Sequence, residues 1–160
     1  MNTRISTWLF EQNVCDALGV IVQKTIENHH NFAWKEQLDG GHEYIVHRKG
    51  ATPAGKGVLG IIPGSMTAPG YIVSGLSNES SLNSAAHGAG RKMSRLKAKN
   101  SVTMSSLKKE LQAMKVTLIG GSPEEAPGAY KDIELVMKSQ TTLVKIEGKF
   151  HPRIVRMAKD

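Results

Sequence analysis

Glycine and proline recur through residues 51–90 and break that part of the chain into short elements. Two apolar pieces with strand-like composition lie between them, VLGII at 58–62 and YIVSG at 71–75. Glycine also lets a backbone approach a ligand closely, because it has no side chain to obstruct the contact. The stretch therefore predicts short strands joined by loops that can shape a binding site.

The spacing of apolar residues elsewhere predicts further helices and strands. Val14, Leu18 and Ile21 recur at helical spacing and predict a helix over 13–27. The other expected elements are a strand at 42–50, a helix at 103–115, a strand at 115–121, a loop at 122–129, a helix at 130–140 and strands at 141–150 and 153–157. With 160 residues, the chain is predicted to form one domain, residues 1–160, of the α+β class, with a mixed sheet and flanking helices.

The balance of charges points to an anionic partner. The chain carries 21 Lys and Arg against 14 Asp and Glu, a formal net charge of +7 at pH 7. Residues 80–109 contain seven of these cationic side chains and no acidic one. This asymmetry favours binding of RNA, DNA or a nucleotide, with a merely solvated basic surface as the alternative. The run has no aromatic side chains on which bases stack, so bound RNA is expected to be held through its backbone with little sequence reading.

Cysteine content and hydropathy favour a cytoplasmic protein. The single cysteine, Cys15, cannot form a disulfide within the chain, which fits a reducing compartment. No signal peptide is expected, because the apolar run ALGVIV at 17–22 is short and follows Glu11 and Asp16. No apolar segment is long enough for a membrane-spanning helix, so no membrane partner is expected.

Two clusters away from the basic run have residues suited to metal or phosphate binding. His29, His30 and His47 are expected at the ends of a helix and a strand, where their imidazoles can meet around Mn, Zn, Fe or Ni. A double histidine with a distant third is by itself a weak signal. The sequence PGSMTAPGY at 63–71 offers backbone N–H groups and hydroxyls to a phosphate or a base. It matches neither the Walker A pattern nor the dinucleotide fingerprint, and a plain turn is the alternative.

The sequence NSAAHGAGRKMSRLKAK at 83–99 places His87 before a flexible Gly-Ala-Gly. A histidine attacks a phosphorus centre when it is unprotonated, oriented and beside donors that stabilise charge on the phosphoryl oxygens. The Gly-Ala-Gly offers such backbone donors without steric obstruction. Arg91 and Arg95 are four residues apart and, if helical, project from one face, where their guanidinium groups suit phosphates. These residues alone leave open whether His87 is a nucleophile or a surface residue in a basic turn.

Five motifs occur in the order of a known family over most of the chain. They are HRKGAT at 47–52, IPGSM at 62–66, NSAAHGAGRKMSR at 83–95, EEAPGAYKDIELVM at 124–137 and the closing Lys159. This pattern resembles the RtcB family of RNA-splicing ligases, and the pair HGAGR and HRKGA is highly specific for it. The resemblance implies an RtcB-like fold and a GTP- and manganese-dependent ligase. Such a ligase joins an RNA 3′-phosphate or 2′,3′-cyclic phosphate end to a 5′-hydroxyl end through a guanylyl-histidine intermediate, in tRNA splicing or RNA repair.

The resemblance also implies a role for individual residues. The histidine that GTP guanylylates corresponds to His87, which favours the nucleophile. Manganese ligands correspond to His47 and, by the family's His-Asn pair, to His30. Nucleotide contacts correspond to Ser65, Ala89, Gly90, Tyr130, expected to stack on the base, and Lys159, expected at its polar edge. Arg91 and Arg95 are then expected to face RNA phosphates.

The chain departs from the family in two ways. Residues 64–71, GSMTAPGY, differ from the usual GSMGTxSY, with Thr67 replacing a glycine and Gly70 a nucleotide-contacting serine. This indicates a divergent subgroup devoted to RNA repair. Family members are more than twice as long, and their N-terminal half supplies an Asp-x-Cys and a Gly-Gly-Asn-His motif that the chain lacks. We therefore expect the C-terminal catalytic portion of such a ligase.

Three readings follow from that expectation. In the first, the chain belongs to an enzyme, as a fragment or as one half of a split ligase completed by another polypeptide. An accessory activator protein is a further expected partner. In the second, the chain is a non-catalytic nucleotide- or RNA-binding module. A structural or interaction protein is the third and weakest reading, because retention of His87, His47 and Lys159 together would be coincidental.

Overall fold

The computed structural model describes residues 13–29, 31–38 and 40–157. Its strands are β1 (Asn31–Leu38), β2 (His42–Lys49), β3 (Ala51–Pro53), β4 (Leu59–Ile62), β5 (Gly70–Gly75), β6 (Ser84–Ala86), β7 (Thr117–Gly120), β8 (Val144–Phe150) and β9 (Ile154–Arg156). Its named helices are α2 (Arg95–Ser101), α3 (Met104–Ala113) and α4 (Ile133–Lys138), with short 3₁₀ turns η1 (Glu79–Ser81), η2 (Pro123–Glu125) and η3 (Pro127–Ala129). The expected α+β class is confirmed.

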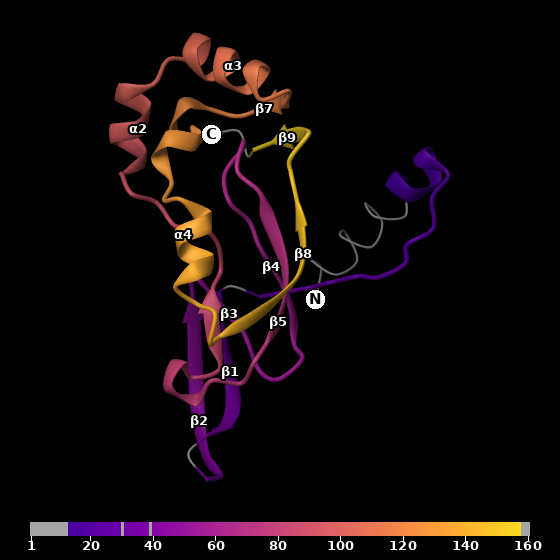
Figure 1. Cartoon of the computed structure of the whole chain (residues 1–160), viewed down its shortest axis with the longest axis vertical. Coiled ribbons are helices and arrows are strands. Elements are labelled where there is room, and N and C mark those ends of the chain that lie inside the picture. The colour runs from indigo at the N-terminus through magenta and orange to yellow at the C-terminus, as the bar shows by residue number, and fades with distance from the viewer. Residues whose placement is uncertain (1–12, 30, 39, 158–160) are drawn as a thin grey trace.

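The strands of the described residues form four small sheets in place of one mixed sheet. Antiparallel pairing joins β1 to β2, β3 to β6, and β4, β5 and β8 in that order, whereas β7 and β9 are parallel. In Figure 1 the β1–β2 hairpin lies at one end of the molecule and α2, α3 and β7 lie at the other, with α4 and the three-stranded sheet between them. Among the described residues, no helix has the length and apolar character needed to cross a bilayer.

The expected helix over 13–27 is wrong beyond its first turns. Residues 13–18 are helical, and the chain then turns at Gly19, whose φ of +63° is in the left-handed region that glycine adopts without steric cost. The β-branched residues that follow have low helix propensity. Instead, Asn28 bonds to strand β4: its Nδ2 donates to the Leu59 carbonyl at 3.0 Å, and its Oδ1 accepts from the Ile61 N–H at 3.1 Å.

A buried arginine ties the hairpin to the rest of the fold. Arg48 on β2 is 2% exposed, and its guanidinium donates to the Glu36 carboxylate at 2.5 Å and to the Ser84 hydroxyl at 2.8 Å. It also lies 5.1 Å from the centre of the Trp34 ring. A buried charge is stable only when it is paired and hydrogen-bonded. Arg48 meets this requirement through Glu36 on β1 and Ser84 on β6.

Most of the expected elements after residue 40 are confirmed. The strands at 42–50, 58–62, 71–75, 115–121, 141–150 and 153–157 and the helices at 103–115 and 130–140 each contain an observed element. Strands β1, β3 and β6 were not expected, and neither was α2. Because α2 begins at Arg95, the condition that Arg91 and Arg95 share a helical face is not met.

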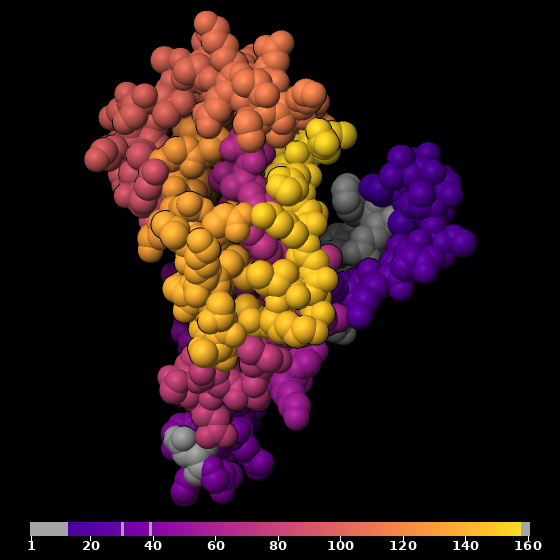
Figure 2. Space-filling model, viewed as in Figure 1, coloured from indigo at the N-terminus to yellow at the C-terminus, as the bar shows by residue number. Residues whose placement is uncertain are grey.

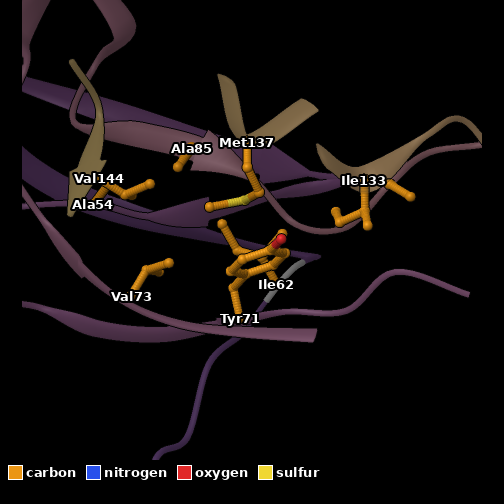
Figure 3. Close-up of a cluster of buried hydrophobic side chains, with 9 residues drawn as sticks. Ala54, Ile62, Tyr71, Val73, Ala85, Ile133, Met137 and Val144 are labelled. Atoms are coloured by element: carbon orange, nitrogen blue, oxygen red, sulfur yellow. The ribbon is translucent and has the colours of Figure 1, made fainter. Parts of the chain in front are cut away.

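Two hydrophobic clusters form the core. The first lies between α4 and the three-stranded sheet, and Figure 3 shows Met137 reaching from α4 toward Ile62 and Tyr71 of the sheet. The second lies under α3 and contains Leu107 and Leu111. The sequence also predicts that the apolar stripe of the helix at 103–115, Met104, Leu107, Leu111 and Met114, packs in the core. This is confirmed for the two leucines, whereas Met104 and Met114 are exposed.

We predict that replacing Arg48 with Ala lowers the free energy of unfolding by about 3 kcal/mol, because the Glu36 carboxylate loses its buried partner. The matched control is Lys35→Ala, which breaks the ion pair to Glu43 on the same hairpin. That pair has side chains 71% and 59% exposed, so its loss should cost less than about 1 kcal/mol. Urea denaturation measures both. Equal losses in the two variants would contradict the anchoring role of Arg48.

Candidate active site

A cavity of about 510 Å³ lies beside His87. We call it the His87 cavity. Residues from five separate parts of the chain line it, including Gly50, Ser65, Arg91, Tyr130 and Val155. Its volume is in the range typical of small-molecule sites. The structure therefore brings together His87 and the predicted nucleotide contacts Ser65, Ala89, Gly90 and Tyr130 at one site.

The loop at 87–90, which we call the histidine loop, is held by backbone hydrogen bonds. The His87 N–H donates to the Gly50 carbonyl at 3.3 Å, just beyond the pairing of β3 with β6. The Ala89 N–H donates to the Pro63 carbonyl at 3.1 Å. This bond occupies the Ala89 amide within the protein, so the residue contributes its backbone position to the cavity wall and not that donor. His87 itself is half-buried at the wall.

Glycines set the backbone shape of the two loops of the cavity. A Cβ atom at Gly64 would lie 2.4 Å from the Pro69 carbonyl oxygen, which is closer than real contacts allow. Gly90 has a φ of +71°, a conformation that other residues adopt at a cost in free energy. Near them, the Ser65 hydroxyl accepts a hydrogen bond from the Ala68 N–H at 3.3 Å and still carries its own proton to donate.

A network of charged and aromatic side chains forms one wall of the His87 cavity. The Tyr130 hydroxyl donates to the Glu125 carboxylate, and the Arg91 Nη1 donates to the same carboxylate at 3.2 Å. The Arg91 guanidinium also donates to the Tyr130 hydroxyl oxygen at 3.3 Å and to the Glu124 carbonyl, and it lies 5.1 Å from the centre of the Tyr130 ring. Burial raises the pKa of Tyr130 to about 12, and the Glu125 carboxylate adds to the shift. Tyr130 is therefore a neutral hydrogen-bond donor at physiological pH.

The two arginines expected to face RNA have different surroundings. Arg91 is largely buried in the wall, and its guanidinium donates to protein groups. Arg95 is 71% exposed and has one loose ion pair to Glu125, 3.8 Å long. Of the two, Arg95 is thus the side chain accessible to a bound strand.

The structure does not test the predicted pair of metal ligands, because only His47 of the two is among the described residues. His47 is exposed on β2, opposite Ala33, and is not among the residues that line the His87 cavity. His29 contacts the Phe32 ring, with ring centres 5.6 Å apart. His30 and Lys159 lie outside the described residues. Among residues 13–29, 31–38 and 40–157, no group of three or more His, Cys, Asp or Glu side chains is placed to hold a metal ion.

Sequence reasoning missed Glu125 as a site residue. Its carboxylate is 14% exposed and is the shared partner of Arg91, Arg95 and Tyr130. The available signal was the motif EEAPGAY at 124–130, in which an acid precedes the predicted base-stacking Tyr130 by five residues. Two 3₁₀ turns, η2, which ends at Glu125, and η3, which precedes Tyr130, each start at a proline and bring the two side chains together.

Comparison with known proteins assigns the family. The family model described as tRNA-splicing ligase RtcB matches residues 1–158. This chain belongs to the RtcB family. It is 42% identical over 146 residues to an RNA-splicing ligase RtcB of Escherichia coli strain K12, covering 84% of this chain and 36% of that protein. It is 39% identical over 147 residues to a tRNA-splicing ligase RtcB of Nanoarchaeum equitans, covering 77% of this chain and 31% of the relative. The chain thus spans about a third of the length of the curated relatives it matches.

We predict that Gly64→Ala lowers the free energy of unfolding by about 2 kcal/mol, because the new methyl group meets the Pro69 backbone. Gly128→Ala is the matched control, since a Cβ there meets nothing within 4 Å. Thermal denaturation of both variants measures the difference. A Gly64→Ala variant as stable as the control would contradict the close packing of this RtcB loop.

We predict that Glu125→Gln lowers the pKa of Tyr130 from about 12 toward the ordinary value of 10.0, because the carboxylate no longer disfavours the phenolate. Spectrophotometric titration of tyrosine measures the shift, and Tyr130→Phe identifies the signal by removing it. Because the folded pKa is raised, Tyr130 contributes stability that is fully present below pH 10 and is lost as the pH rises through about 12. A titration curve unchanged in Glu125→Gln would contradict the network.

Proposed function

We propose that this chain carries the guanylyl-transfer site of an RNA ligase that joins 3′-phosphate or 2′,3′-cyclic phosphate ends to 5′-hydroxyl ends. In the proposed reaction, a ring nitrogen of His87 forms a bond to the α-phosphorus of GTP, and pyrophosphate leaves. The RNA 3′-phosphate then accepts the guanylate from His87, which restores the imidazole. Attack of the 5′-hydroxyl on the activated phosphorus forms the phosphodiester bond between the two RNA ends and expels GMP.

One observation carries the proposal: His87 lies at the wall of a cavity that is lined by residues from five separate parts of the chain. The histidine loop, the loop at 63–66 and Tyr130 come from three of the motifs that define the resemblance. A surface histidine without a role in the site would not be expected to lie beside residues from two other motifs of the same family. The names of the relatives, RNA-splicing and tRNA-splicing ligases, add support from outside the structure.

The residues of the His87 cavity fit a nucleotide. The volume of about 510 Å³ suits a ligand of nucleotide size. The Ser65 hydroxyl supplies a proton to an acceptor on the ligand, and the glycines let a phosphate approach the backbone. We propose that the neutral Tyr130 ring packs against the guanine base, with Arg91 and Glu125 holding it in place. Lys159 remains a proposed contact to the polar edge of the base.

Manganese remains part of the proposal through the family resemblance, but the described residues do not form a site for it. They offer His47 alone of the two proposed ligands, and a transition-metal site usually takes three or more protein ligands. Such an ion would need His30 and further donors, and no step above depends on it.

The proposed RNA partner fits the charge of the chain. The net charge of +7 attracts a polyanion, and the exposed Arg95 stands beside the wall of the His87 cavity. Candidate substrates are the cleaved halves of tRNA and broken RNA in repair. We propose a cytoplasmic location from the single cysteine, and an activator or a complementing polypeptide as further partners.

A second candidate is a nucleotide- or RNA-binding module that is not catalytic alone, or one half of a split ligase. The observation that favours it is that, among the described residues, no group of three or more His, Cys, Asp or Glu side chains is placed to hold a metal ion. The two candidates differ in one outcome. A binding module takes up GTP without forming a bond to His87.

The test is incubation with Mn²⁺ and GTP labelled at the α-phosphate, followed by denaturing electrophoresis. We expect covalent label on the chain and none on His87→Ala. The matched control is His42→Ala, which removes an exposed imidazole at the tip of the β1–β2 hairpin and should keep the label. Label that persists in His87→Ala would contradict the proposed nucleophile, and GTP binding without any label would favour the binding module.

A further inference from the structure

A second cavity, of about 440 Å³, lies between α3 and β7. We call it the lysine cavity, because Lys108 and Lys115 both line it. Gln112 and Thr117 add an amide and a hydroxyl to its wall, and Leu118 adds an apolar surface. Cations beside neutral hydrogen-bonding groups and a small apolar area match the parts of a nucleotide in a nucleic-acid strand: phosphate, ribose and base.

The surroundings of the lysine cavity are strongly basic. Between Arg95 and Lys115 the sequence has six cationic side chains and one acidic one, Glu110. Neither Lys108 nor Lys115 forms an ion pair with another described residue. In Figure 2 the segment that contains them, coloured orange, forms one end of the molecule and is open to solvent in this view. An anion can therefore reach both lysines without displacing a protein carboxylate.

The backbone at Lys115 gives independent support. Its φ of +56° is in the left-handed region, at the turn that follows α3. Glycine is the residue that favours this position after a helix, and a lysine there costs folding free energy. The side chain placed at that cost lines the lysine cavity, as Lys108 does. Glycine at position 115 would give the folded chain a higher stability than lysine does.

The second hydrophobic cluster separates the two cavities. Leu111 and Val116 belong to this cluster and line the lysine cavity, whereas Met66 and Met157 belong to it and line the His87 cavity. A ligand in the lysine cavity therefore lies across this core from His87 and cannot be the reacting end. It would be a part of the strand at a distance from the join.

We propose that the lysine cavity binds the backbone of an RNA strand, with one phosphate between Lys108 and Lys115. This inference rests on the proposed function and names a contact for its RNA partner. Gln112 and Thr117 donate hydrogen bonds to phosphate or ribose oxygens, and Leu118 contacts the sugar. Because no aromatic side chain lines the cavity, the contact is independent of base sequence.

The test measures RNA binding without ligation. A fluorescently labelled single-stranded RNA with blocked ends is titrated with the full chain, and anisotropy gives the dissociation constant at several salt concentrations. We expect the double variant Lys108→Ala, Lys115→Gly to bind about tenfold more weakly, as expected for loss of charge-assisted hydrogen bonds. The salt dependence should also become shallower by about one phosphate contact.

Two further variants distinguish loss of the proposed contact from a general loss of positive charge and from an effect on folding. Lys56→Ala removes an exposed lysine outside the cavity and should change the dissociation constant by less than about twofold. Lys115→Gly alone should weaken RNA binding while its melting temperature stays unchanged or rises, because glycine suits the left-handed backbone. A structural role for Lys115 predicts the opposite temperature change.

Three results would overturn the proposal. The first is an RNA affinity of the double variant equal to that of the wild type, and the second is an equal loss of RNA affinity in Lys56→Ala. The third is competition by polyglutamate as effective as that by RNA of equal charge, which would indicate an acidic protein partner. Labelling of His87 by GTP, measured in the same variants, should be retained. If the wild-type chain takes no label, the proposed ligase function fails, yet the RNA affinities still decide this inference.

Discussion

The backbone bonds of the histidine loop are the constraint on which the rest of the site depends. They tie residues 87–90 to Gly50, Pro63 and Lys131, which are far apart in the sequence. Because these bonds fix the loop at both of its ends and at Ala89, the loop has few alternative positions. Because the loops that it joins carry Ser65 and Tyr130, the same bonds bring the cavity wall together around His87. The β1–β2 hairpin is attached separately, through Arg48.

The wall of the His87 cavity combines charge with a small core. Glu125 neutralises Arg91 and accepts from Tyr130, so the guanidinium and the phenol stay in the wall without an unpaired charge. The second hydrophobic cluster lies behind this wall and extends to the lysine cavity. This cluster therefore has the His87 cavity on one side and a basic surface on the other. That arrangement suits a protein that holds a polyanionic strand while one end of it reacts.

Local patterns were sufficient for much of the fold and for part of the site. Strands β4 and β5 and helix α3 follow from apolar spacing, because tertiary contacts agree with it there. The segment 20–29 does not, because Gly19 ends the helix and Asn28 pairs with β4. The family motifs were enough to select His87 and its neighbours. They could not reveal that Arg91 turns inward to Glu125, because that pairing depends on the turns at 123–129 and leaves no periodic signal.

The central claim is that His87 accepts guanylate within this cavity. The most direct measurement is mass spectrometry of the chain after incubation with GTP and Mn²⁺, with the adduct mapped to a peptide under alkaline conditions that preserve a phosphoramidate. We predict one added guanylate, on the peptide that contains His87. An adduct on a different residue, or GTP bound by the folded chain with no adduct, would contradict the claim.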